Sequence, residues 1–468
     1  MIRFFRFSGP FQFGILFFMI WLFRMPLFLT DTPLLWEDVN HLALGEKLAD
    51  GFLIYRDIID STGPLAATVY WFISVFAARS LVTFYVIAGF LLFIQSQIFK
   101  WLCSNNDILS DKGDLPALLY VVVASTCFDF FSLSPAFISL TFVLIALNSI
   151  FKHIKSENNE GEIFTTGLFL GLAYLTFAPA LAFFILSFFT FAVFTRSSVR
   201  YYFLFATGFI FPTLLCLTIF FMLDGFTEFV HYYLFQFPAA IGFESNFGWK
   251  ILAFMVLPSF LFGLMGVIRA FTYKRFIIYQ VISQRIIFIW LVVTLLIVTF
   301  FFKETTSAFS LTIPFIAFFI THFFQLIKQK KLGGYLLLIY VIYSLRMVYS
   351  YIDLPFLNKN LINFNNQVAA PSKWNKVFEN KKILVIGKEN AVFQNNKLAT
   401  CYFDFELSQP ILAHPEYYEN TNHIYSAFLT DMPDVIIDNE VLMPNIVEKV
   451  PYIKNHFYQS EKGIYVRK

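Results

Sequence analysis

The sequence predicts an α-helical polytopic membrane protein that ends in a small α/β domain outside the membrane. The chain of 468 residues is 58% hydrophobic and only 14% charged, whereas globular proteins carry about a quarter charged residues. Its apolar residues form long runs over residues 1–352, and the composition becomes that of a soluble domain over 373–468. Because a soluble chain of this length needs a polar surface, lipid must be the solvent for most of the first part.

Twelve apolar runs predict the transmembrane helices. The first, 11–29, follows Arg3 and Arg6 and is not followed by a small-residue cleavage site, which is typical of an uncleaved signal anchor. The others are 64–79, 81–99, 115–131, 134–151, 164–177, 178–194, 203–223, 250–270, 285–302, 309–327 and 333–351. Several are shorter than the roughly 20 residues that cross a bilayer core, so neighbouring short runs can be half-helices or tilted spans.

Charged residues between the runs predict the orientation, because loops rich in lysine and arginine stay on the cytoplasmic side. The segment 31–63 holds seven acidic residues against two basic ones, which predicts an external loop. The basic segments 269–285 and 328–331 are expected inside. A cytoplasmic N-terminus and an external tail require an odd number of crossings. The sequence therefore predicts eleven or thirteen transmembrane helices in a bacterial inner (cytoplasmic) membrane.

The tail 373–468 reads as a small extracytoplasmic α/β domain. The apolar runs ILVIG (383–387), CYFDF (401–405) and DVIID (434–438) alternate with helices expected near 421–430 and 441–449, before a closing GIYVRK. The single glycine that ends ILVIG is not a G-x-G-x-x-G fingerprint, which argues against a dinucleotide site. The chain also has no basic run interleaved with aromatic residues, so nucleic acid is not an expected partner.

The external loop 31–63 carries the residues best suited to chemistry. Its apolar residues recur at nearly helical spacing after Glu37 and Asp38, which predicts an amphipathic helix along the outer membrane surface. Asp60 closes the loop just before the next span, so acids from both ends can converge. A carboxylate can take a proton from an attacking hydroxyl, and two or three can hold a divalent cation against a leaving phosphate. A solvated acidic loop without function is the alternative reading.

This loop resembles the opening of GT-C superfamily glycosyltransferases, the group that includes protein O-mannosyltransferases and the lipid A aminoarabinose transferase. The family pattern has an acidic pair, an aromatic four residues after its first member, a small residue four further on, a helix-ending glycine and a proline-rich start of the next span. The matching residues are Glu37-Asp38, His41, Gly45, Gly51 and GPL (63–65). The order ED inverts the commoner DE, and a histidine replaces the usual tyrosine.

Two further segments carry the resemblance. GLFLGLAYLTFAPALAFF (167–184) is similar to a family helix that is broken at a proline near the outer face, although Phe177 stands where many members have a lysine. Many bacterial members also end in a small external α/β domain like 373–468. The missing lysine keeps a second interpretation open, in which the protein is a non-catalytic membrane subunit or scaffold of a cell-envelope assembly. A transporter would favour ionisable residues deep inside several helices, and most charges here lie at helix ends.

The resemblance implies transfer of a sugar from a polyprenyl-phosphate donor to a glycan, lipid or protein acceptor at the outer, periplasmic face. It implies Asp38 as the first candidate for the catalytic base or a metal ligand and Glu37 as the second candidate. Asp60 falls near a second acidic position of some members and is the other expected ligand of a divalent metal ion, the one cofactor considered.

Three cations are candidates for the donor phosphate. Arg56 is the cation nearest to the loop acids, and arginine suits a phosphate anion. His231 lies in the external loop 224–249, whose counterpart in the family helps to close the phosphate site. Arg346 lies near the outer end of the last span, where an arginine is costly unless it snorkels or meets an anion. The alternatives are a snorkelling or salt-bridged side chain for Arg56, an interfacial aromatic-belt position for His231 and a snorkelling side chain for Arg346.

Overall fold

The computed structural model describes residues 2–29, 36–156, 159–195, 198–235, 249–273, 275–301, 307–349, 374, 377–388 and 390–468. Asp31 and Glu244, two acids of the expected external loops, lie outside the described residues, as does the segment 351–373 between the predicted domains. The chain divides into two compact units. The predicted division at 352 and 373 stays a prediction, because the second unit combines the C-terminal residues with 33–81 and 216–237.

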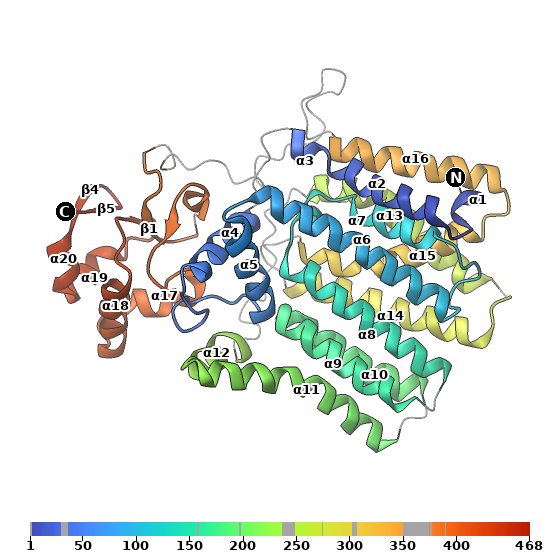
Figure 1. Ribbon diagram of the computed structural model, residues 1–468, viewed down its shortest axis with the longest axis horizontal. Helices are drawn as coiled ribbons and strands as arrows, with labels where there is room; N and C mark the ends of the chain where they lie inside the picture. Colours follow the sequence, from blue (N-terminus) through green and yellow to red (C-terminus); the bar gives the residue numbers. More distant parts are fainter. Residues whose placement is uncertain are drawn as a thin grey trace. The chain divides into compact units, whose positions relative to one another are not determined.

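The first unit is a bundle of helices. Within it α8 packs along α9, and α15 packs against both α7 and α13 (Figure 1). Its helices are α1 (Ile2–Phe5), α2 (Pro10–Arg24), α3 (Pro26–Leu29), α6 (Leu81–Asn105), α7 (Leu115–Ala124), α8 (Pro135–Lys155), α9 (Glu160–Thr176), α10 (Leu181–Phe194), most of α11 (Val199–Met222), α13 (Trp249–Thr272), α14 (Ile278–Phe301), α15 (Ile313–Gln325) and α16 (Lys330–Tyr349). Short 3₁₀ turns η1 (Phe128–Phe131), η2 (Ala178–Ala180) and η4 (Ser307–Thr312) lie between them.

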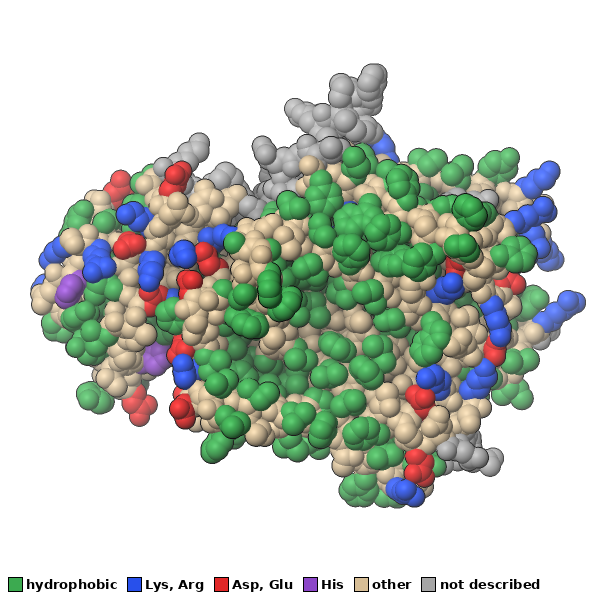
Figure 2. Space-filling view, viewed as in Figure 1, with side chains coloured by type: hydrophobic (Ala, Val, Ile, Leu, Met, Phe, Trp, Pro, Cys, Tyr) green, Lys and Arg blue, Asp and Glu red, His purple; other side chains and the backbone are tan. Residues whose placement is uncertain are grey.

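Each of the twelve predicted apolar runs contains a helix. Six stretches of the described chain are long and apolar enough to cross a membrane by length and composition: Leu81–Asn105, Pro135–Lys155, Val199–Met222, Ile278–Thr299, Ser307–Gln325 and Lys330–Tyr349. Five shorter apolar helices accompany them. Hydrophobic side chains are spread over the visible side of the bundle (Figure 2). Together with the small C-terminal sheet, these helices confirm the predicted class of polytopic α-helical membrane protein.

The segment 167–184 has the broken-helix form that its sequence predicts. Helix α9 ends at Thr176, Phe177 is extended with φ −149°, and η2 leads into α10. Two glycines let α9 approach α11 closely: a Cβ on Gly167 would lie 2.2 Å from the Phe205 carbonyl oxygen, and one on Gly171 2.5 Å from that of Phe209. Small residues that allow such backbone contact are typical of helix pairs in membranes.

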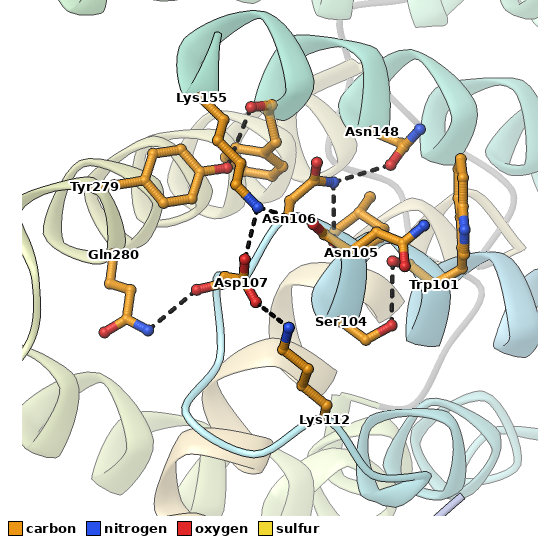
Figure 3. A network of polar contacts seen from close by, with 12 residues as sticks. Trp101, Ser104, Asn105, Asn106, Asp107, Lys112, Asn148, Lys155, Tyr279 and Gln280 are labelled. Carbon is orange, nitrogen blue, oxygen red and sulfur yellow. Dashed lines mark hydrogen bonds and ion pairs between the residues drawn. The ribbon is translucent and has the colours of Figure 1, made fainter.

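Polar contacts tie the helix ends together at one end of the bundle (Figure 3). The Asp107 carboxylate, in the turn between α6 and α7, binds Lys112 and Lys155 at 2.6 Å each, and its carbonyl accepts from Gln280 of α14 at 3.0 Å. Asn106 donates to the Leu102 carbonyl oxygen (3.0 Å) and to the amide oxygen of Asn148 in α8 (2.9 Å). Basic side chains gather at this end (Figure 2).

The second unit places two helices from the loop region beside the C-terminal domain. Helix α4 (Trp36–Ala49) packs on α5 (Pro64–Ala77), where a Cβ on Gly45 would lie 2.8 Å from the Tyr70 carbonyl oxygen. Helix α4 is the helix predicted in the external loop. However, its polar Asp38, His41 and Lys47 are buried together with its apolar residues, because η6 (Asn390–Gln394) and β2 pack against it as well.

A five-stranded sheet forms the centre of the C-terminal domain, in the order β2-β1-β3-β5-β4. The first three are parallel neighbours, with Ile383 of β1 opposite Val435 of β3, and β5 pairs antiparallel with both β3 and β4. The elements are β1 (Lys382–Ile386), β2 (Lys397–Leu398), β3 (Val435–Asp438), β4 (Phe457–Glu461), β5 (Ile464–Arg467), α17 (Phe405–Ala413), α18 (Tyr418–Thr430), α19 (Met443–Lys449) and α20 (Pro451–His456). The unit also contains α12 (Phe226–Phe229) and a π-helical turn, Val230–Leu234.

The apolar run CYFDF is not a strand of this sheet. Its Tyr402 makes an isolated parallel bridge with Ile59, a residue of the external loop. The Ile59 side chain is 1% exposed and belongs to the core of the C-terminal domain, with Leu384, Ile436 and Tyr402. Full burial of such a side chain stabilises the fold by about 2 kcal/mol. The loop therefore contributes to the core of the domain.

Candidate functional site

Three of the predicted site acids meet around one tyrosine of α5. Glu37 and Asp38 lie in the first turn of α4, and their negative charges act on the Tyr70 phenol together with that of Asp60. The imidazole of His41 stacks on the Tyr70 ring at 4.5 Å between centroids. Asp38 is fully buried and Asp60 is 6% exposed. The charges of acids from both ends of the loop thus act on one phenol, and the convergence of these acids into one reaction site stays a prediction.

Local sequence explains why these acids take up these positions. The acidic pair begins α4, and negative side chains are favourable in the first turn because the helix dipole is positive there. Asp60 lies four residues before Pro64, the first residue of α5, and proline is well suited to that position because it lacks the N–H that would be unsatisfied. One acid therefore precedes α5 as two others begin α4.

Asp60 has an unusual environment. One carboxyl oxygen accepts from the backbone N–H of Ser61 at 2.8 Å, while Oδ2 is buried without a hydrogen-bond partner. Burial, reinforced by the negative charge of Asp404, raises the pKa of Asp60 to about 7. A carboxyl group with such a pKa exchanges its proton near neutral pH, as general acids and bases do.

Asp404 is a neighbour that the sequence did not reveal. It caps α17, because its Oδ1 accepts from the backbone N–H groups of Glu406 (3.0 Å) and Leu407 (3.4 Å). Its Oδ2 accepts from the Ser61 hydroxyl at 3.1 Å. An aspartate before a helix predicts a cap, but no local pattern predicts a contact with a loop more than 300 residues away.

A buried ion pair was also missed. Lys47 of α4 is 4% exposed, binds Asp431 and donates to the Leu398 carbonyl oxygen at 3.2 Å. Asp431 binds Lys382 as well, at 2.7 Å. Its hydrogen bonds to these two lysines keep the pKa of Asp431 below its usual value despite burial, which by itself would raise it. In the sequence Lys47 looked like one more charge of a solvated loop.

The three candidate phosphate-binding cations have different surroundings. Arg56 holds Asp57 through Nε (3.0 Å) and Nη2 (2.9 Å), and its Nη1 donates to the Leu223 carbonyl oxygen (2.9 Å). His231 is exposed on the π-helical turn beside Tyr232. Arg346 lies in α16 of the first unit, where its Nη1 is buried without a hydrogen-bond partner.

The donor set does not favour a metal ion. Within the described ranges, no three His, Cys, Asp or Glu side chains come together as metal ligands. His41 stays neutral, because burial lowers its pKa to about 3, yet it does not complete a ligand group with Asp38 and Asp60. The described residues therefore do not fit a divalent cation, and no step below depends on one.

Comparison with known proteins shows similarity only at the level of structure. No protein-family model and no curated protein matches the chain. The apo oligosaccharyltransferase of Archaeoglobus fulgidus has a similar structure, with a TM-score of 0.52, 12% identity and coverage of 98% of this chain and 74% of that one. The same enzyme, AglB, in complex with an inhibitory peptide and a dolichol-phosphate, gives the same values. ArnT from Cupriavidus metallidurans bound to undecaprenyl phosphate gives a TM-score of 0.53 at 11% identity, over 75% of this chain and 67% of that one.

Fold and composition together define the class. AglB and ArnT are both GT-C glycosyltransferases, and the described helices are apolar enough to span a bilayer. The chain is a membrane protein with the GT-C fold, as its resemblance to that superfamily implied.

Proposed function

We propose that the protein is a membrane glycosyltransferase that moves a sugar from a polyprenyl-phosphate donor to a glycan, lipid or protein acceptor at the outer face of the membrane. The observation that carries this proposal is the convergence of Glu37, Asp38 and Asp60 around Tyr70, in a chain with the GT-C fold. Two proteins with similar structures have been solved with a polyprenyl phosphate, dolichol-phosphate in AglB and undecaprenyl phosphate in ArnT, which supports a donor of this class.

In the proposed reaction, Asp38 accepts the proton of the acceptor hydroxyl as its oxygen attacks the anomeric carbon of the sugar. The bond from that carbon to the phosphate oxygen breaks, and the polyprenyl phosphate leaves with the electron pair. Glu37, next to Asp38 in the first turn of α4, is the second candidate for this catalytic role. Burial makes Asp38 effective because charges interact more strongly where water is excluded.

Arg56, His231 and Arg346 are retained as proposed contacts of the donor phosphate. Arg346 has the strongest case, since a buried guanidinium nitrogen without a partner is costly unless an anion meets it. Arg56 would have to exchange its contacts with Asp57 for the phosphate. A divalent cation at Asp38 and Asp60 is left out of the mechanism, because the described ligands do not favour it.

The proposed location is a bacterial inner membrane, with a cytoplasmic N-terminus and the C-terminal domain in the periplasm. The gathering of basic side chains at one end of the bundle supports this orientation, because positive loops remain in the cytoplasm. The acids around Tyr70 would then face the periplasm, where a lipid-linked sugar and its acceptor meet.

The test is sugar transfer in membranes that contain the Asp38→Asn variant. This change keeps nearly the same volume and removes the charge, so transfer of a labelled sugar from polyprenyl phosphate should fall about a hundredfold, as for a lost general base. Asp50→Asn is the matched control, because Asp50 is half exposed and its ion pair with the half-exposed Lys397, at 3.5 Å, contributes little. Full transfer by Asp38→Asn, at equal protein abundance, would remove the proposed base and favour the scaffold alternative.

A further inference from the structure

The C-terminal domain holds both neighbours of Asp60. The Ile59 N–H donates to the Cys401 carbonyl oxygen at 2.8 Å, and the Asp404 N–H donates to the Ile59 carbonyl oxygen at 3.0 Å. On the other side, the Ser61 hydroxyl donates to the Asp404 carboxylate at 3.1 Å. These contacts between 59–61 and 401–404 are called the clamp below. Asp60 is therefore held from both sides by a segment more than 300 residues away.

Burial makes the clamp stiff. The Ile59 side chain is 1% exposed within the core of the C-terminal domain, so residues 59–61 cannot move without withdrawing it from that core. Asp404 is fixed as well, because it caps α17 through its other carboxyl oxygen.

The helix that carries the other two acids is fastened to the same domain. Lys47 of α4 pairs with Asp431 inside it and donates to the carbonyl oxygen of Leu398. Helix α4 begins with Glu37 and Asp38. Both acid-bearing elements, α4 and the segment 59–61, thus have anchors in the C-terminal domain.

We propose that the C-terminal domain is a working part of the catalytic site, in which the clamp positions Asp60 against Glu37 and Asp38, with Ile59 and Asp404 as positioning residues. This inference rests on the proposed function and deepens it. Displacement of a catalytic group by about 1 Å can cost a hundredfold in rate. Loosening the clamp should therefore lower kcat by tenfold or more and leave the KM for the donor lipid nearly unchanged.

The first test compares two isoleucine truncations in the same core. Ile59→Ala and Ile453→Ala remove the same atoms from buried positions of one cluster, so both should lower the melting temperature. Only Ile59→Ala should also lower kcat, measured on the purified full-length protein well below both melting temperatures. Equal kcat values for the two variants would overturn the inference.

A second pair separates geometry from charge at position 404. Asn can still cap α17 and hydrogen bond to Ser61, so Asp404→Asn should lose less kcat than Asp404→Ala, and its pH profile should shift to lower pH because the charge that helps to raise the pKa of Asp60 is gone. Asp404→Ala loses both contacts and should lose tenfold in kcat. Full activity of Asp404→Ala would contradict the clamp.

The experiments distinguish a failure of the proposed function from a failure of the clamp. If the wild-type protein consumes no polyprenyl-phosphate sugar, that function is wrong and this inference with it. If the wild type is active and Asp38→Asn is not, while the clamp variants turn over normally, only the clamp is wrong.

Discussion

At the scale of single residues, the distinctive property of the site is the raised pKa of the buried Asp60 carboxyl group. An aspartate in an unfolded chain loses its proton near pH 4, whereas the pKa of Asp60 is raised to about 7, first by burial and then by the charge of Asp404. Between these values the folded protein binds a proton that the unfolded chain has released. Stability should therefore fall as pH rises from about 4 to about 7, and this contribution should level off above pH 7.

We expect Asp60→Asn to remove this pH dependence. The amide keeps the shape of the carboxyl group and has no proton to lose, so the melting temperature of the variant should fall less than that of the wild type between pH 5 and pH 8. Thermal unfolding of both purified proteins across this range makes the comparison. A difference in melting temperature that does not change with pH would show that Asp60 is ionised throughout.

Sequence patterns were sufficient for some of these residues and not for others. Glu37, Asp38 and Asp60 could be identified as candidates from the sequence, because they lie in one loop between a helix-start pattern and the proline that begins the next helix. Asp404 and Lys47 could not be read, because their roles depend on contacts with residues far away in the chain. For the same reason the prediction that α4 is amphipathic was wrong, since its polar residues Asp38, His41 and Lys47 are buried.

At the scale of elements, apolar length predicted the helices of the bundle, and the alternation of runs predicted β1, β3, α18 and α19 of the C-terminal domain but not α17, α20, β2 or β4. CYFDF could not be assigned in this way, since a short apolar run pairs with whatever backbone the fold supplies, here Ile59.

The turn between α6 and α7 shows which polar contacts matter for stability. Its charged pairs, Asp107 with Lys112 and Lys155, are partly exposed, whereas Asn106 and Asn148 are buried.

We predict that Asn106→Ala destabilises the bundle more than Asp107→Asn does. Exposed ion pairs contribute about 0–1 kcal/mol each, and asparagine tolerates the positive φ of 53° at position 107. Loss of the Asn106 amide leaves the Leu102 carbonyl and the Asn148 oxygen without their buried donor, a cost of about 1–3 kcal/mol. Melting temperatures in detergent rank the two variants, and the reverse order would contradict this reasoning.

At the scale of the whole molecule, the choice between eleven and thirteen crossings stays a prediction, on which the contacts at one end of the first unit bear. Ion pairs and hydrogen bonds at one end join segments flanking nearly every helix of the first unit: Arg6 with Asp111, Lys152 with Glu162, Arg200 with Glu160, Arg269 with the Phe323 carbonyl and Gln325 with the Asp111 carbonyl. Successive helices therefore alternate in direction. If α2, α6–α11 and α13–α16 each cross once and α5, the predicted span 64–79, does not cross, the chain crosses eleven times, an odd number as the charge pattern requires.

Reporter fusions test this topology. A reporter placed after Lys331 should be cytoplasmic and one after Lys468 external, because α16 alone would then cross between the basic segment 328–331 and the tail. Finding both reporters on the same side of the membrane would refute the orientation.

The central claim is chemical, and the donor lipid tests it most directly because the acceptor need not be known in advance. The purified full-length protein, in a bilayer with envelope extract as the source of acceptor, is given polyprenyl-phosphate sugars, and mass spectrometry measures the free polyprenyl phosphate. The account predicts that the wild type releases it from at least one donor and that Asp38→Asn releases it about a hundredfold more slowly. Intact donors with the wild type, or equal release by the two proteins, would contradict it.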